Sequence, residues 1–150
     1  MRLIVTGHRE EKLVNYDCHW IDAKVHSLVA ISMRDYGVSL AYSGMASGVD
    51  LYFCKACVAN GLPFIACVPF EGQEKSMTLS NVFVREEYLK KAKEIKKVKN
   101  SWMVENCDIA IVVWDGNKGG THNVVQQLVE RKKNFFWINP VSCIVWNCFI

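Results

Sequence analysis

Short apolar runs alternate with stretches of helical hydrophobic spacing along most of this sequence. Five runs are apolar at successive positions rather than at every second position, which is typical of strands covered on both faces. These runs occupy residues 3–5, 38–42, 62–68, 109–114 and 135–138. The alternation predicts an α/β domain of the Rossmann-like type, in which a mainly parallel sheet forms the middle of three layers and helices cover both its faces.

Helical spacing marks the segments between the apolar runs. A helix is predicted over residues 18–36, with Gly37 as its stop, and a second over 47–60, closed by Asn60-Gly61. Further helices are predicted over 83–93, over 102–107 and around 124–129. Residues 70–82 are predicted as a polar loop, and residues 95–98 as either the end of a helix or a short edge strand.

The length of the chain bounds its domain organisation. A chain of 150 residues, 51% of them hydrophobic, buries enough surface for one core and leaves too little sequence for a second domain. We expect residues 1–140 to form that domain. Residues 141–150 are apolar at both alternating registers, so they form either a further covered strand or a contact in a homo-oligomer, and the contact is favoured.

Charge is distributed unevenly but is small in total. A net charge of +3 does not by itself call for a nucleic-acid or membrane partner. Residues 85–99 hold seven basic residues and three glutamates, which we interpret as a solvated helix face rather than a phosphate-binding surface. The uncharged segment 134–150 is interrupted by Asn139-Pro140 and Asn147, so no membrane span is predicted.

The cysteines indicate a reducing environment. There are seven, an odd number, in a chain whose apolar start is too short for a secretory leader, so a cytoplasmic protein with free thiols is expected. Cys54 and Cys57 are separated by two residues, as in one of the two cysteine pairs of a metal site. Both fall in a predicted helix and no second pair follows, so no metal site is predicted.

Small residues cluster in three loops that follow predicted strands, at residues 6–9, 43–50 and 115–121. The carboxyl ends of parallel strands meet at one edge, so these loops should gather near the switch in strand order between the first and fourth predicted strands. Glycine lets a phosphate approach the backbone, and the second and third loops each open a helix whose N-terminus favours an anion. The sequence therefore predicts a site for a phosphorylated small molecule.

Each loop also has a purely structural interpretation. Ser47 and Asp50 match a capping box, Thr121 can cap the last helix, and Asp115-Gly116 is an ordinary turn. Arg9 is a candidate phosphate clamp and His8 a candidate hydrogen-bond donor to a sugar or phosphate, unless both belong to an exposed polar loop. The coincidence of all three loops at one edge favours the pocket.

The motifs resemble those of a known superfamily. They are Thr6-Gly7-His8-Arg9, the run from Ser43 to Asp50, Pro69-Phe70 with Gly72-Gln73, Trp102-Met103-Val104, Trp114-Asp115-Gly116, and Gly119-Gly120-Thr121 with Asn123. Together they are similar to the SLOG superfamily, most closely its YpsA-like branch, across most of residues 1–140. The resemblance implies a Rossmann-like nucleotide-binding domain whose first, second and last motifs contact the ligand. The candidate ligand-binding residues are Thr6, Gly7, His8, Arg9, Ser43, Gly44, Met45, Ala46, Gly48, Asp50, Pro69, Gln73, Asp115, Gly116, Gly119, Gly120, Thr121 and Asn123.

This resemblance leaves three functions open. The favoured one is a sensor or sequestering protein for a nucleotide-derived ligand, such as an ADP-ribose-like or cyclic signal, with no cofactor required. The first alternative is cleavage of N-glycosidic bonds, as in the related Lonely-guy phosphoribohydrolases and nucleoside deoxyribosyltransferases. Its candidate carboxylates are Asp50, Glu71 and Asp115, but Val124 stands where the phosphoribohydrolase motif has a glutamate. The second alternative is DprA-like binding of single-stranded DNA, which the small net charge disfavours.

Overall fold

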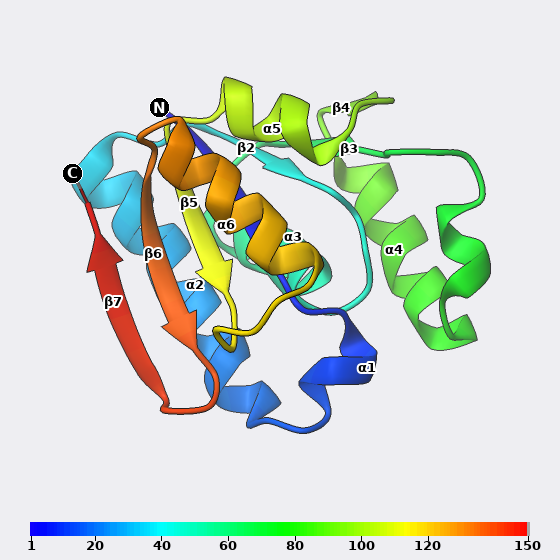
Figure 1. The fold of residues 1–150 in the computed structure, drawn as a ribbon. Helices are drawn as coiled ribbons and strands as arrows, with labels where there is room; N and C mark the ends of the chain where they lie inside the picture. The colour runs from blue at the N-terminus through cyan, green and yellow to red at the C-terminus, as the bar shows by residue number, and fades with distance from the viewer. Residues whose placement is uncertain (150) are drawn as a thin grey trace.

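The computed structural model describes residues 1–149, and these contain a seven-stranded sheet in the order β4-β3-β2-β1-β5-β6-β7 (Figure 1). Neighbouring strands are parallel, except for β6 and β7, which are antiparallel. The strands are β1 (Arg2–Gly7), β2 (Leu40–Ser43), β3 (Phe64–Cys67), β4 (Glu94–Lys96), β5 (Ile109–Val113), β6 (Asn134–Asn139) and β7 (Ile144–Cys148). The predicted Rossmann-like α/β architecture is confirmed.

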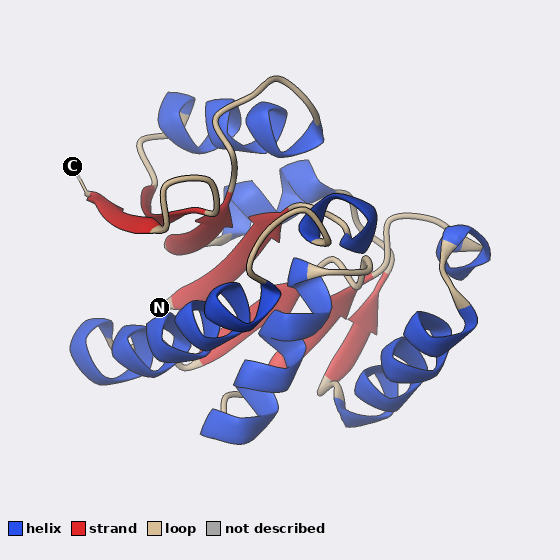
Figure 2. Cartoon of the chain, turned by 90° about the horizontal axis from the view of Figure 1, so that it is seen from below, coloured by secondary structure: helices blue, strands red, loops and turns tan. Residues whose placement is uncertain are grey.

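Helices cover both faces of this sheet, which forms the middle layer in Figure 2. The helices are α1 (Glu10–Leu13), α2 (Cys18–Tyr36), α3 (Val49–Asn60), α4 (Leu79–Lys91), α5 (Asn100–Asn106) and α6 (Gly120–Glu130), with the 3₁₀ helix η1 (Gln73–Ser76). One face packs against α2 and α3, and the other against α5 and α6. None of the helices in residues 1–149 is long and apolar enough to cross a membrane.

The buried strands explain why the sequence is apolar at successive positions. Leu3 and Val5 of β1 point into the core beneath α2 and α3, whereas Ile4 between them packs in the core beneath α5 and α6. The five residues of β5 are all buried and alternate between these two cores in the same way. A strand in the middle of three layers therefore needs apolar side chains on both faces.

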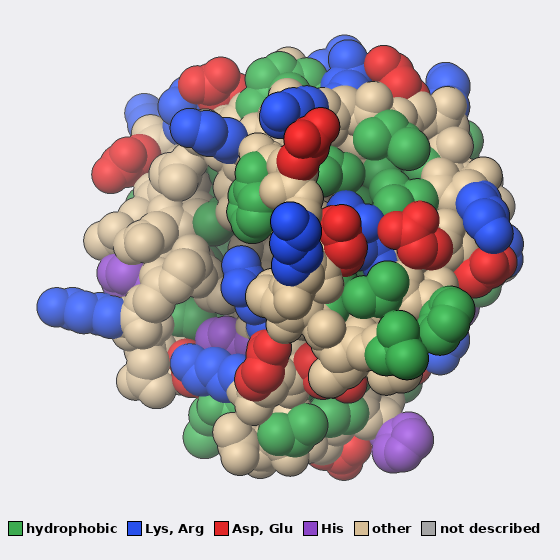
Figure 3. Space-filling model, turned by 90° about the vertical axis from the view of Figure 1, so that its right-hand side faces the viewer, with side chains coloured by type: hydrophobic (Ala, Val, Ile, Leu, Met, Phe, Trp, Pro, Cys, Tyr) green, Lys and Arg blue, Asp and Glu red, His purple; other side chains and the backbone are tan. Residues whose placement is uncertain are grey.

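The predicted boundaries are wrong around residues 70–93. Helix α4 begins at Leu79 rather than at 83, because the Thr78 hydroxyl caps it by accepting a hydrogen bond from the Asn81 N–H. Leu79 and Phe83 are 73% and 65% exposed, so no buried apolar stripe marks this start, and Figure 3 shows hydrophobic side chains exposed on this side of the molecule. The predicted loops also contain η1 and α1, whereas residues 94–96 do form an edge strand.

The C-terminal segment joins the sheet of its own domain. Strand β7 lies antiparallel beside β6, and Val145 and Phe149 pack on the α2 side of the sheet. Ile144 and Trp146 are exposed, so this strand is covered only in part. The predicted subunit contact stays a prediction, and Ile150 lies outside the described residues.

Candidate functional site

A cavity of about 420 Å³ lies at the carboxyl ends of β1 and β5, where the strand order switches. This size falls within the range of roughly 300–1,000 Å³ that small-molecule sites occupy. The predicted residues that line it are Thr6, Gly7, His8, Arg9, Gly44, Ala46, Asp50, Pro69, Gln73, Gly119, Gly120 and Thr121. The structure thus brings residues of all three small-residue loops to one cavity.

Other predicted site residues do not line this cavity. They are Ser43, Met45, Gly48, Glu71, Asp115, Gly116 and Asn123. Glu71 is exposed, and the Asp115 carboxylate is enclosed by protein groups. Of the three candidate catalytic carboxylates, only Asp50 reaches the cavity.

The first turn of α6 forms part of the cavity wall. Gly119 occupies the N-cap position, and no side chain caps the helix. The prediction that Thr121 caps α6 is therefore wrong, since Thr121 lies inside the helix with its hydroxyl 3.5 Å from Nδ1 of His8. A Cβ added to Gly120 would have no atom within 4 Å, so the backbone here is open to an approaching group. An uncapped helix start offers free N–H groups and the positive end of the helix dipole.

Two other glycines have a different role, because the protein itself fills the space beside them. A Cβ on Gly7 would lie 2.9 Å from the side chain of Val49. A Cβ on Gly48 would lie 2.7 Å from the His8 carbonyl oxygen, and the φ angle of Gly48 is +84°. These glycines allow the loop after β1 to pack directly against the start of α3, where the Val49 N–H donates to the His8 carbonyl.

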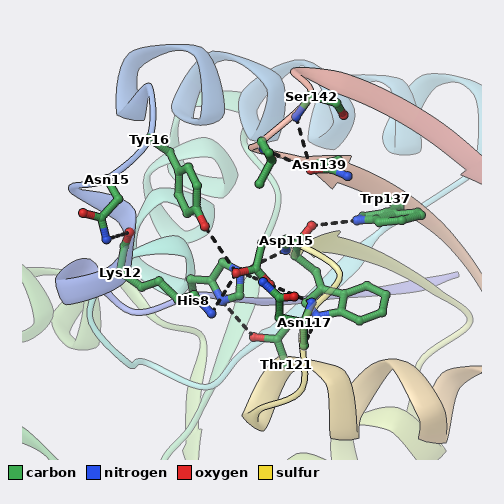
Figure 4. Close-up of polar contacts among 12 residues, drawn as sticks. His8, Lys12, Asn15, Tyr16, Asp115, Asn117, Thr121, Trp137, Asn139 and Ser142 are labelled. Carbon is green, nitrogen blue, oxygen red and sulfur yellow. Dashed lines mark hydrogen bonds and ion pairs between the residues drawn. The ribbon is translucent and has the colours of Figure 1, made fainter.

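The Asp115 carboxylate joins the loop after β5 to the segment after β1 (Figure 4). One oxygen accepts from Lys12 Nζ at 2.8 Å and from the Tyr16 hydroxyl at 3.2 Å, and the other accepts from the Asn117 N–H at 3.0 Å. Burial alone would raise the pKa of Asp115, but the hydrogen bonds from Lys12 and Asn117 outweigh it and hold this pKa below its usual range. Asp115 therefore connects two segments in addition to standing in a turn, and both of its carboxylate oxygens already have partners within the protein.

His8 is buried and both of its ring nitrogens face protein groups. Nε2 accepts from the Asp115 N–H at 3.1 Å, so the proton of the neutral ring belongs on Nδ1, which faces the Thr121 hydroxyl (Figure 4). Burial lowers the pKa of His8, and the charge of Lys12 lowers it further. These contacts give His8 a structural role, because they tie the segment after β1 to the loop after β5 and to the first turn of α6, while donation from His8 to a ligand stays a prediction.

Asp50 lies in the first turn of α3 and faces the cavity. One carboxyl oxygen accepts from the Ala46 N–H at 3.1 Å, so the predicted capping box with Ser47 does not form. Burial raises the pKa of Asp50 to about 7, against the opposing effects of the Ala46 N–H and the charge of Arg9. A carboxyl group with this pKa is present in both protonation states near neutral pH.

Gln73 lines the cavity, but its side-chain amide is bound within the protein. Its Nε2 donates to the Gly44 carbonyl at 2.8 Å, and its Oε1 accepts from Arg85 at 3.1 Å. Arg85 is only 4% exposed, which corrects the interpretation of residues 85–99 as a uniformly solvated face. Gln73 and Arg85 therefore hold the loop after β2 in place.

Ten residues of the cavity lining were not predicted from the sequence. They are Ile4, Val5, Glu11, Lys12, Asn100, Met103, Asn117, Lys118, His122 and Val124. Asn117 and Lys118 lie within the third loop, so their position between the glycines was a usable signal. Lys12 lies in a segment predicted as a loop, and nothing in the local pattern indicates that α5 brings Asn100 to the same cavity.

Comparisons with known proteins support the fold. No protein-family model and no curated protein matches the sequence. Among solved structures, the X-ray structure of TM1055, a target of the Northeast Structural Genomics Consortium, is similar with a TM-score of 0.53. The match covers 89% of this chain and 71% of that chain at 14% sequence identity, which shows the fold alone. The fold and the site together define an α/β protein with a Rossmann-like sheet and a ligand-sized cavity at its switch point.

Proposed function

We propose that this chain binds a nucleotide or nucleotide-derived small molecule, as a sensor or sequestering protein, with the ligand's phosphate at the N-terminus of α6. The observation that carries the proposal is the open first turn of that helix. Gly119 leaves the helix uncapped, and Gly120 exposes its backbone at the cavity wall. Such a helix start binds phosphate through free N–H groups and the helix dipole.

Two cations in the same cavity support this placement. Arg9 and Lys118 are exposed, and within residues 1–149 neither side chain makes a hydrogen bond or an ion pair. A guanidinium binds a phosphate through two parallel hydrogen bonds, and an ammonium adds a point charge. Lys12 also lines the cavity, but the Asp115 carboxylate at 2.8 Å offsets its charge, so Arg9 and Lys118 are the cations available to a phosphate.

Substitution of Gly120 tests the proposal. Gly120→Val places a branched side chain at the open wall and should abolish binding of AMP, ADP-ribose and inorganic phosphate in isothermal titration calorimetry. Its circular dichroism spectrum should stay native, because the added Cβ meets no atom within 4 Å. Ser101→Val is the matched control, since it places valine in the first turn of α5 outside the cavity. Full affinity in Gly120→Val would refute the phosphate site.

Cleavage of an N-glycosidic bond is the second candidate function, and the position of Asp50 favours it. A carboxylate inside a nucleotide site can stabilise the positive charge that develops on the sugar during cleavage. Incubation with nucleoside monophosphates, followed by chromatography, measures release of the free base. Steady release that disappears in Asp50→Asn would favour the enzyme, whereas no release supports the binding protein.

A further inference from the structure

The loop after β2 is built in a fixed shape that presents Asp50 to the cavity. The Gly44 carbonyl is held by Gln73, and the Ser43 hydroxyl accepts from the Met45 N–H at 3.3 Å. Met45 is fully buried with a φ of +59°, which is unusual for a residue with a side chain. Such a conformation persists only where the surroundings enforce it, and it is concentrated at binding sites.

One oxygen of the Asp50 carboxyl group has a partner and the other has none. Oδ2 accepts from the Ala46 N–H, whereas no hydrogen bond reaches Oδ1 from any residue in 1–149. Asp50 is half-buried, and its Oδ1 keeps contact with solvent at the cavity. A ligand that enters this cavity displaces the water from Oδ1, which then needs a hydrogen-bond donor from the ligand.

The charges around Asp50 indicate which donor fits. The positive charge of Arg9 already acts on Asp50, so a ligand ammonium group would gain less here than beside a carboxylate with no cation near it. Hydroxyl groups donate equally well and carry no charge, so Arg9 does not oppose them. A sugar hydroxyl can therefore donate to Oδ1, while Oδ2 keeps its hydrogen bond from the Ala46 N–H.

We propose that Asp50 binds the sugar hydroxyls of the ligand and makes this site selective for ribosyl phosphates over their deoxy analogues. This inference rests on the proposed function, because the phosphate at α6 anchors the other end of the same ligand. Asp50 then determines specificity, whereas Arg9, Lys118 and the first turn of α6 provide the affinity for the phosphate.

Calorimetry with three probes tests the assignment: inorganic phosphate, AMP and 2′,3′-dideoxy-AMP. The wild-type protein should bind AMP at least about tenfold more tightly than the dideoxy analogue, which corresponds to one hydrogen bond to a charged group. Asp50→Asn should remove this preference and keep its affinity for inorganic phosphate. The asparagine Oδ1 can still accept from the Ala46 N–H, and thermal unfolding will check that the loop is intact.

The outcomes separate the two proposals. If none of the three probes binds, the phosphate site and the inference both fail. If inorganic phosphate binds but AMP does not, or if AMP and its dideoxy analogue bind equally, the sugar assignment fails and the phosphate site stands. A preference that survives unchanged in Asp50→Asn also overturns the role of Asp50.

The pH dependence of the preference for AMP over its dideoxy analogue provides a second test, because a purely structural role of Asp50 would not produce one. The groups that act on Asp50 are Arg9 from the loop after β1, Cys54 from α3 and Cys67 from β3, while α5 contributes the neutral Asn100. Burial raises the pKa of both thiols to about 12, so they stay neutral. The preference for AMP should grow as pH rises through about 7, where Asp50 ionises, and should be independent of pH in Asp50→Asn. Using the ratio of the two affinities cancels the titration of their common phosphate.

Discussion

Replacing Asp115 with asparagine removes the negative charge from the cluster that joins the loop after β5 to α1. The substitution leaves Lys12 without its ion pair and weakens the hydrogen bond from Tyr16. The Asn117 N–H keeps an acceptor, because the asparagine side chain retains one oxygen. The loss of stability therefore comes from the removed negative charge, because asparagine has nearly the same size and shape as aspartate.

The magnitude follows from the exposure of each partner. The Asp115 side chain is 1% exposed, and a hydrogen bond to a charged buried group contributes about 1.5–3 kcal/mol. The Lys12 side chain is 42% exposed, so water screens the ion pair and its contribution is about 1 kcal/mol or less. We expect Asp115→Asn to lower the free energy of unfolding by about 2–3 kcal/mol, which lowers the Tm by about 4–12 °C.

Urea unfolding followed by circular dichroism measures this loss, with Asp35→Asn as the control. Asp35 forms an ion pair with Arg34 on an exposed surface, so its substitution should have a much smaller effect. The pKa of Asp115 is lower in the folded state, so its stabilisation is complete above the unfolded-state pKa of about 4 and declines as pH falls below it. Equal losses in the two variants at pH 7, or a difference that does not shrink below pH 4, would refute the reasoning.

Three further predictions concern packing, the loop after β2 and assembly. Gly48→Ala should lower the Tm by several degrees, because its Cβ would meet the backbone at 2.7 Å, whereas Gly120→Ala should leave the Tm unchanged; identical melting curves would contradict the close approach at Gly48. Arg85→Met removes the hydrogen bond from Arg85 to Gln73 and should speed amide hydrogen exchange over residues 43–48, measured by mass spectrometry. Unchanged exchange would show that the hydrogen bonds from Arg85 to Gln73 and from Gln73 to Gly44 do not hold the loop. Trp146→Glu places a charge on β7, where Trp146 is 50% exposed, and should dissociate the expected homo-oligomer in light scattering; an unchanged mass would show that β7 is not the contact.

The sheet could be predicted because its buried strands are apolar at every position. All five residues of β5 are buried, so each position between 109 and 113 carries the same apolar signal. Helix α4 lacked such a signal, since Leu79 and Phe83 are exposed and its start depends on a hydrogen bond from Asn81 to Thr78. Local patterns predict elements that face a core and miss those that are fixed by single polar contacts.

The site was predictable in its location and not in its details. Parallel strands bring the loops after them to one edge, so the positions of Gly44 and Gly120 followed from chain order. The roles of individual residues depend on partners distant in sequence. Position 48 must be glycine because the His8 carbonyl leaves no space for a Cβ, and the Asp115 carboxylate forms an ion pair with Lys12. No local sequence pattern indicates either contact.

The glycines around the site differ in what surrounds them, and this decides which loops tolerate substitution. Gly7 and Gly48 pack closely against other segments of the same chain. A substitution in the loop after β1 therefore requires a matching change in the loop after β2. Gly116, Gly119 and Gly120 border open space, but the φ angles of Gly116 (+89°) and Gly119 (+154°) favour glycine, so new side chains are tolerated at Gly120 and at the exposed Asn117 and Lys118. A library of variants at residues 117 and 118 should therefore yield folded proteins that accept ligands of different size, and the same number of substitutions at residues 6–9 should yield mainly unfolded ones.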